Sequence, residues 1–366
     1  MSFPNLFNPI QMGTQTLKNR IFMAPLTRLR AIEPGDVPTP LAKTYYSQRA
    51  GAGLIITEAT QVSYQAKGYA GAPGIHTSEQ MDAWREVVQA VHDKGGKIVV
   101  QLWHTGLVSH KSVQPDGKAP ISASDVDVGV RTSLRDDDGN AIRESATPPR
   151  PATLEEIKQV IADFASATKN AKEVGFDGVE IHGAHGYLLH QFWAKQTNKR
   201  NDEYGGSREN RARLMLDVIS ACVDAWDNDH VGIRISPLGS FNNVDGGYDE
   251  DEALWLIEQI NQHKLMYLHL SEPDWAGGTP YNDAFRQGIR ERFEQVIIAA
   301  GGYTAEKASK LIEAGLIDAV VFGRDYIANP DLAERIKVGA ELNEQRPELF
   351  YGGGAEGYTD YPFMND

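Results

Sequence analysis

Short apolar runs alternate with longer amphipathic stretches along most of the chain, and this alternation predicts strands separated by helices. Eight apolar runs rich in β-branched residues have the length of strands: 21–25, 53–60, 98–103, 178–182, 231–236, 266–271, 296–300 and 319–323. Most of them are continuously apolar, which is typical of parallel strands that are buried on both faces.

The amphipathic stretches carry helix start and stop signals. Thr153 precedes Glu156 by three residues, as in a capping box, and Gly175 follows the last apolar position of that stretch. Asp331 and Glu334 have the same spacing and indicate another helix start. Eight strand–helix units in series predict an α/β protein with a single (β/α)8 TIM-barrel domain over residues 1–366.

A doubly wound parallel sheet is the alternative arrangement of such units. It usually has a glycine-rich turn after the first strand, but residues 24–28 read Ala-Pro-Leu-Thr-Arg. Two segments lie outside the repeat. Residues 5–20 predict an N-terminal hairpin that caps the barrel bottom. Residues 104–150 form a long polar excursion after strand three, expected over the active-site face because connections of this length usually serve a function.

Composition narrows the class of protein. The chain has 366 residues, 41% of them hydrophobic, and a formal net charge of −14, which argues against nucleic acid or an anionic membrane as partner. No apolar run approaches the roughly 18 residues of a membrane helix, and no signal peptide is evident, so a cytoplasmic location is expected. Cys222, the one cysteine, lies in an apolar helical pattern and is expected in the core.

The richest polar cluster follows the fourth predicted strand. His182, His185 and Tyr187 come where this buried strand ends, and Gly183 and Gly186 are expected to let the backbone turn sharply between them. Chemistry in a barrel is located at the carboxyl ends of its strands. These side chains therefore suit the polarisation of a substrate oxygen or the movement of a proton.

The two histidines have competing interpretations. A catalytic zinc needs a third ligand, and the helical His-Glu-x-x-His pattern is absent, so no metal is expected. A structural role inside a turn is the second interpretation, and substrate binding is favoured over both. A serine–histidine–acid triad is not indicated because the Gly-x-Ser-x-Gly turn is missing.

The loops after strands seven and eight indicate phosphate binding. Gly302 precedes Thr304 and the start of a helix, and Gly323 precedes Arg324, so backbone N–H groups and one guanidinium are available. Ordinary strand-to-helix turns are the alternative. Aromatic residues also gather near predicted loop ends, where they either pack or line a flat apolar cavity: Tyr69, Trp103, Tyr187, Trp275 and Tyr351.

The chain resembles the Old Yellow Enzyme family of FMN-dependent ene-reductases, most closely its bacterial branch of N-ethylmaleimide and pentaerythritol tetranitrate reductases. The resemblance covers essentially the whole sequence. It rests on motifs at 24–30 (APLTRLR), 101–104 (QLWH), 178–187 (GVEIHGAHGY), 201–207 (NDEYGGS), 323–325 (GRD), 329–331 (NPD) and 351–354 (YGGG).

The resemblance implies an FMN-binding barrel and a set of cofactor and substrate contacts. The residues implied to hold FMN are Pro25, Leu26, Thr27, Ala59, Gln101, Arg234, Gly302, Gly323 and Arg324. Those implied to shape the substrate cavity are Tyr69, Trp103, Trp275 and Tyr351. His182 and His185 would bind the substrate oxygen, and Tyr187 would donate the proton. Arg131 and Arg143 are implied contacts of the nicotinamide cofactor.

The implied reaction is a ping-pong oxidoreduction. NADPH or NADH reduces FMN, and a hydride then passes from flavin N5 to an activated C=C bond of an α,β-unsaturated carbonyl, a maleimide or a nitro compound; quinones are further substrates. A monomer or weak dimer is expected. A flavin-independent aldolase or isomerase and a flavin-binding protein without turnover are the alternatives from other classes.

Overall fold

A closed ring of parallel strands forms the centre of the structure, a computed structural model that describes residues 3–136, 138–245 and 249–365. Nine strands pair in the order β11-β12-β13-β14-β15-β3-β4-β6-β5, and β6 also pairs with β11, which closes the ring. Their bounds are β3 (Ile21–Met23), β4 (Ile55–Ile56), β5 (Thr60–Gln61), β6 (Ile98–Trp103), β11 (Val179–His182), β12 (Val231–Ile235), β13 (Tyr267–Ser271), β14 (Val296–Ala300) and β15 (Ala319–Phe322). Since β4 and β5 both lie beside β6, the ring has the eight positions of a TIM barrel, and the predicted fold is confirmed.

The second predicted strand, 53–60, is interrupted. The hydroxyls of Thr57 and Thr60 both donate to the carbonyl of Glu58, at 2.9 and 2.8 Å. Such local side-chain bonds compete with strand pairing for backbone groups, so the strand divides into β4 and β5. The Glu58 carboxylate accepts the backbone N–H of Arg28 at 3.0 Å, which connects the loops that follow the first two barrel positions.

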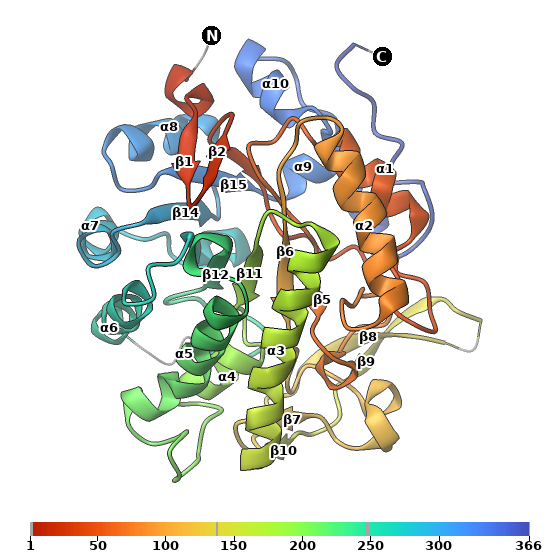
Figure 1. Cartoon of the computed structure of the whole chain (residues 1–366), viewed down its shortest axis with the longest axis vertical. Helices are drawn as coiled ribbons and strands as arrows, with labels where there is room; N and C mark the ends of the chain where they lie inside the picture. Colours follow the sequence, from red (N-terminus) through yellow and green to blue (C-terminus); the bar gives the residue numbers. More distant parts are fainter. Residues whose placement is uncertain (1–2, 137, 246–248, 366) are drawn as a thin grey trace.

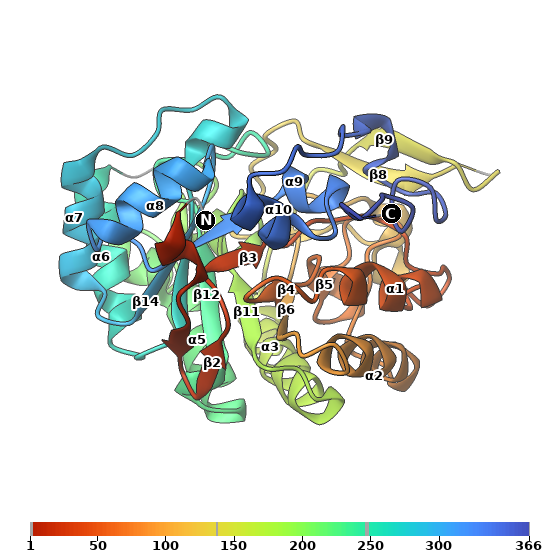
Figure 2. The same cartoon turned by 90° about the horizontal axis from the view of Figure 1, so that it is seen from above.

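Helices surround the ring, as Figures 1 and 2 show. Their bounds are α1 (Pro40–Gln48), α2 (Ser78–His92), α3 (Leu154–Val174), α4 (Leu188–Trp193), α5 (Arg208–Ala225), α6 (Glu250–Asn261), α7 (Asp283–Arg292), α8 (Ala305–Glu313), α9 (Arg324–Ala328) and α10 (Leu332–Val338). None of the helices that the structure describes combines the length and apolar composition needed to cross a membrane.

The predicted helix caps are partly confirmed. Thr153 and Glu156 form the reciprocal bonds of a capping box, and Gly175 ends the helix with φ 99°. The predicted helix start at Asp331 is confirmed, because α10 begins at the next residue, although the Asp331 side chain makes no capping hydrogen bond. Its carboxylate instead accepts from Nε of Arg335 at 2.7 Å and from the backbone N–H of Met364 at 2.6 Å.

Strand residues alternate between the helical layer and the barrel interior. Outward residues such as Val100, Ile181 and Ile233 belong to the large core shared with the helices. The interior is divided. Its apolar part includes Phe22, Leu54, Ile56, Val99, Ile298 and Val321. The inward positions of β6, β11, β12 and β13 instead carry buried polar side chains: Gln101, Glu180, Arg234 and His269.

The predicted N-terminal hairpin is present. Strands β1 (Ile10–Met12) and β2 (Gln15–Leu17) pair antiparallel. Ile10, Met12 and Leu17 pack against the apolar interior of the barrel, so the hairpin closes one end of it. Gly13 turns the hairpin with φ 54°.

The predicted excursion after β6 carries β7 (Ile121–Ser122), β8 (Arg131–Arg135), β9 (Ala141–Ser145) and β10 (Arg150–Pro151). Strands β8 and β9 form an antiparallel hairpin that extends from the body of the molecule in Figure 2. At its base, Val130 and Ala146 pack in one cluster with Tyr69 and Trp103. The excursion therefore reaches the carboxyl end of the barrel.

The C-terminal segment is bound to the first strand-to-helix loop by arginines. Arg28 donates from Nε to the carbonyl of Phe350 at 2.8 Å and from Nη2 to that of Gly357 at 2.7 Å. Arg30 donates from Nε to the carbonyl of Gly354 at 3.0 Å. Both guanidiniums lie over the Tyr358 ring, 5.1 and 4.6 Å from its centre. These contacts fix the segment that contains Tyr351 at the rim.

We expect Gly13→Ala to lower the free energy of unfolding by about 3 kcal/mol, because a Cβ there meets a left-handed backbone and lies 2.2 Å from the Asp229 carbonyl oxygen. Gly95→Ala is the matched control: its φ is 67° with no atom within 4 Å of the added Cβ, so a loss of about 1 kcal/mol is expected. Urea denaturation measures both. Equal losses would show that the hairpin does not press against the barrel end.

Candidate active site

His182 ends β11 with one ring nitrogen already bonded. Its Nδ1 accepts the backbone N–H of Ala184 at 3.3 Å. Burial, together with the positive charge of Arg234, holds the pKa of His182 well below its usual value, so the ring is neutral at pH 7. A neutral ring that accepts at Nδ1 carries its proton on Nε2. His182 is therefore a hydrogen-bond donor at the carboxyl rim of the barrel.

His185 is held in a left-handed conformation, with φ 59°. Its backbone N–H donates to Oγ of Ser236 at 3.0 Å, and its carbonyl accepts from Nδ2 of Asn242 at 3.1 Å. Its ring Nε2 lies 2.8 Å from Oγ of Ser271. Left-handed backbone is unusual for a residue other than glycine and persists only where neighbouring groups hold it. Three side chains thus fix this histidine: two from the segment after β12 and one from the end of β13.

The expectation that both glycines allow a sharp turn is correct for Gly186 and wrong for Gly183. The left-handed residues are His185 and Gly186, whereas Gly183 has no positive φ. A Cβ at Gly183 would lie 3.1 Å from the Arg234 carbonyl oxygen, and one at Gly186 would lie 2.6 Å from the Phe241 carbonyl oxygen. Gly183 therefore serves close packing against β12 rather than the turn.

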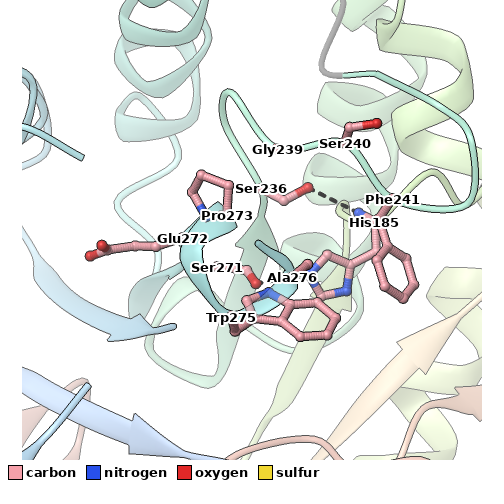
Figure 3. A pocket seen from close by; sticks show the side chains of 10 residues that line it. All are labelled: His185, Ser236, Gly239, Ser240, Phe241, Ser271, Glu272, Pro273, Trp275 and Ala276. Carbon is pink, nitrogen blue, oxygen red and sulfur yellow. Dashed lines mark hydrogen bonds between the residues drawn. The ribbon is translucent and has the colours of Figure 1, made fainter. Parts of the chain in front are cut away.

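A small pocket, partly open to solvent, lies beside His185 (Figure 3). The rings of His185, Phe241 and Trp275 pack together, with centres 5.1 to 5.6 Å apart. Ser236 and Ser271 supply hydroxyls to the same pocket. The side chain of Glu272 points away from it and binds Arg286.

A second group of aromatic rings, here called the aromatic wall, packs against His182. Trp103 stacks on Tyr69 at 5.4 Å and meets the edge of Tyr187 at 5.0 Å. Tyr187 lies 5.1 Å from the His182 ring, and its hydroxyl is 3.3 Å from that of Tyr69. Burial, and then the neighbouring Tyr69, raise the pKa of Tyr187 well above its usual value, so it is a neutral phenol at pH 7.

A polar network fills the barrel beneath the histidines. Nε2 of Gln101 donates to Oε1 of Glu180 at 2.7 Å, and Oε2 of Glu180 lies 2.7 Å from Nδ1 of His269. Burial lowers the pKa of Arg234 to about 10, which still leaves a cation at pH 7. Nη2 of Arg234 is 3.4 Å from Oγ of Ser271, and its buried Nε has no partner among the described residues.

The sequence prediction did not assign roles to several of these residues. Glu180 and His269 each lie between apolar residues within a predicted strand. A single polar residue at such a buried position was the only signal in the sequence that could have identified them. Ser236, Phe241 and Asn242 gave no such signal, because their positions depend on the loop after β12.

The residues predicted to bind phosphate, Gly302, Gly323 and Arg324, lie at the ends of β14 and β15. The backbone N–H of Gly302 donates to Oδ1 of Asp274 at 2.8 Å, and Asp274 also binds Lys307 at 3.2 Å. Arg324 is exposed at the start of α9. Any anion that binds the Gly302 N–H therefore displaces Asp274.

The remaining predicted residues lie at the same end of the barrel. Pro25, Leu26 and Thr27 are half-buried, and a Cβ at Gly323 would lie 3.5 Å from Leu26. Ala59 is buried in the cluster of Tyr69 and Trp103. Tyr351 is 62% exposed in the C-terminal segment. Within the described ranges, no group of three or more His, Cys, Asp or Glu side chains is arranged to hold a metal ion.

Comparison with known proteins gives a consistent result. The sequence pattern of the NADH:flavin oxidoreductase / NADH oxidase family matches residues 5–343. A structure of morphinone reductase aligns with TM-score 0.95 and 45% identity, covering 100% of this chain and 98% of that one. The Old Yellow Enzyme homologue from Zymomonas mobilis aligns with TM-score 0.92 and 37% identity, covering 99% and 100%. The 12-oxophytodienoate reductase 2 of Arabidopsis thaliana is 41% identical over 364 residues, 98% of this chain and 96% of that protein.

The barrel and its rim of polar and aromatic residues thus define a flavin oxidoreductase. The chain belongs to the NADH:flavin oxidoreductase / NADH oxidase family, that of the Old Yellow Enzymes. FMN is the cofactor and NAD(P)H the electron donor, as predicted. The narrower resemblance to the N-ethylmaleimide reductase branch stays a prediction, since the curated relatives compared are plant 12-oxophytodienoate reductases.

The polar groups present fit FMN. Arg234 offers a buried cation whose Nε has no partner among the described residues, which suits the electron-rich N1–C2=O edge of a flavin. Gln101, on the far side of β11 from Arg234, offers a buried amide.

The lowered histidine pKa values predict a pH dependence of stability. Above a pH of about 6.5, His182 and His185 are neutral in both the folded and the unfolded chain. Below that pH the two histidines take up protons in the unfolded chain but not in the folded one, so the free energy of unfolding decreases as the pH decreases. We expect this loss to shrink by up to about 1.4 kcal/mol per pH unit for each histidine replaced by asparagine. Urea titrations at pH 7 and 5 of His182→Asn and His185→Asn test it, with His110→Asn as a control outside the site. An unchanged pH dependence in both site variants would contradict the neutral assignment.

Proposed function

We propose that this protein is an ene-reductase that reduces electron-poor alkenes bearing a carbonyl or nitro group. The observation that carries the proposal is the pair of neutral histidines, His182 and His185, whose ring centres are 5.4 Å apart. They lie between the aromatic wall and the ring cluster that contains Trp275. Two relatives, one of them a solved structure, support the class of substrate by name, because morphinone and 12-oxophytodienoate both denote carbonyl compounds.

FMN, when bound, supplies the two-electron chemistry, taking a hydride from NAD(P)H and delivering one to the alkene in a ping-pong cycle. The residues proposed to hold it are Pro25, Leu26, Thr27, Ala59, Gln101, Arg234, Gly302, Gly323 and Arg324. Thr27 is proposed to bind the flavin O4. Gly302, Gly323 and Arg324 are proposed to bind the phosphate of FMN. Gln101 and Arg234 are proposed to bind the pyrimidine edge, where a fixed cation stabilises added negative charge.

His182 and His185 are proposed to bind the substrate oxygen as neutral donors. For His182 the donor is Nε2–H, because Nδ1 accepts from Ala184. For His185 the donor is Nδ1–H: Ser271 accepts from Arg234 and in turn donates its hydroxyl proton to Nε2. Together they stabilise the negative charge that develops on that oxygen during reduction.

Tyr187 is proposed as the proton donor to the α-carbon. Its raised pKa keeps the proton on the hydroxyl, and Tyr69, 3.3 Å away, orients it. Tyr69, Trp103, Trp275 and Tyr351 are proposed to shape the cavity for maleimides, nitro compounds and quinones as well as enones. A monomer or weak dimer in the cytoplasm, without nucleic-acid or membrane partners, stays the prediction from the sequence.

Arg131 and Arg143 are proposed to contact the nicotinamide cofactor. They lie on the β8–β9 hairpin, where each guanidinium donates to the other's carbonyl oxygen. Arg143 also donates to Oγ of Ser133 at 2.9 Å, so its side chain lies along the hairpin near Tyr69.

The direct test is anaerobic stopped-flow spectroscopy of the purified yellow protein. We expect NADPH or NADH to bleach the flavin absorbance, and 2-cyclohexenone to restore it. A flavin that NAD(P)H reduces but that no enone, maleimide or nitroalkene reoxidises would refute the ene-reductase proposal and indicate another acceptor.

Tyr187→Phe separates the proton donor from the hydride chemistry. We expect flavin reduction by NAD(P)H to be unchanged and enone reduction to slow by about 10²- to 10⁴-fold, the usual contribution of a general acid. Tyr204→Phe is the matched control, because it removes a tyrosine hydroxyl that binds Asp217 outside the site and keeps the ring, so enone reduction should stay at the wild-type rate. If enone reduction by Tyr187→Phe matches that of the wild type, solvent supplies the proton.

A further inference from the structure

A carboxylate that the proposed chemistry does not use is buried inside the barrel. Glu180 and His269 both have 0% exposed side chains. Glu180 connects Gln101 on β6 with His269 on β13, with both contacts at 2.7 Å. The contact with His269 passes across β12, which lies between β11 and β13 in the sheet.

The β12 residue at the level of Glu180 is a glycine. Gly232 is in register with Glu180 on one side and with Tyr267 on the other. A Cβ at Gly232 would lie 2.5 Å from the Tyr267 ring, so no side chain fits there. The Tyr267 ring therefore covers the glycine, next to Glu180.

The network joins a negative charge to the cation of Arg234. Burial opposes ionisation of Glu180, yet the contacts with His269, Arg234 and Gln101 hold its pKa below the usual value, so it is a carboxylate at pH 7. Burial lowers the pKa of His269, which therefore donates as a neutral ring through Nδ1. Arg234 is in register with His269 on the neighbouring strand. The network thus has one negative and one positive charge.

Glu180 also fixes the orientation of Gln101. A carboxylate only accepts hydrogen bonds, so the NH₂ group of Gln101 faces Glu180 and its Oε1 faces the other way. The two groups proposed to bind the flavin pyrimidine edge are thus both governed by Glu180: one by a hydrogen bond, the other by charge.

We propose that Glu180, held by His269, is a positioning residue that sets how strongly the site prefers reduced over oxidised FMN. The inference rests on the proposed placement of the flavin edge against Gln101 and Arg234. Glu180 offsets part of the Arg234 charge and so limits the stabilisation of the extra negative charge on reduced flavin. It keeps the bound flavin a strong enough reductant for the alkene.

The test measures the midpoint reduction potential of the holoprotein against a reference dye, together with the Kd of FMN. In Glu180→Gln we expect the preference for reduced FMN to rise about tenfold, a positive shift of about 30 mV for a two-electron couple. Asp177→Asn is the matched control, because Asp177 is a buried carboxylate at the opposite end of the same strand, paired with Lys97 at 2.8 Å. Its potential should equal that of the wild type.

His269 provides a second, independent pair of variants. His269→Leu removes the donor to Glu180 and should shift the potential in the same positive direction, whereas His269→Asn keeps an N–H donor and should return it toward the wild-type value. A purely structural role would lower the melting temperature or FMN occupancy in both variants without this directional difference. Equal reduction potentials in His269→Leu and His269→Asn would overturn the proposal. This comparison remains decisive even when Glu180→Gln does not fold.

Arg234→Gln distinguishes failure of the inference from failure of the proposed function. It should lower the potential, since it removes the cation. A lowered potential in Arg234→Gln with no shift in Glu180→Gln would refute the role of Glu180 and leave the flavin placement intact. No shift in either variant would refute the placement of the flavin edge itself.

Discussion

Closure of the parallel sheet is the constraint on which the rest of the structure depends. In a closed ring every second strand residue must point inward, and the register of neighbours decides which inward residues share a level. Pairing of Glu180 with Gln101, of His182 with Arg234 and of Arg234 with His269 puts the polar groups in one part of the interior. The apolar residues of the opposite strands fill the remainder. The site therefore has a rigid floor before any loop contributes.

The loops act on that floor through hydrogen bonds to backbone. His185 keeps its left-handed conformation because Ser236 and Asn242, which follow β12, bind its N–H and carbonyl. The direction of its ring is thus decided by a segment more than fifty residues away in the sequence. Substitutions in that segment act on the histidine without touching any ligand.

The sequence predicted the barrel because its strands are continuous apolar runs, and it predicted His182, His185 and Tyr187 as a cluster because strand ends converge in such a fold. The aromatic wall of Tyr69 and Trp103 follows from the same convergence. What the sequence could not supply is register. The contact between Glu180 and His269 joins two strands that are not neighbours, which no local pattern reveals. The Asp274 contact with Gly302 likewise joins two loops whose relative position only the folded chain defines.

The arginine contacts between the first loop and the C-terminal segment bear on how the protein is made. Arg28 and Arg30 emerge early in translation, yet the carbonyls of Phe350, Gly354 and Gly357 that satisfy them are synthesised after every strand of the barrel. The final strand, β15, also pairs with the first barrel strand, β3. The two buried guanidiniums therefore find these carbonyl partners only after all the described strands of the barrel have been synthesised. Closure of the barrel between β3 and β15 and the contacts of Arg28 and Arg30 thus both join early and late parts of the chain, and the rim of the active site depends on both.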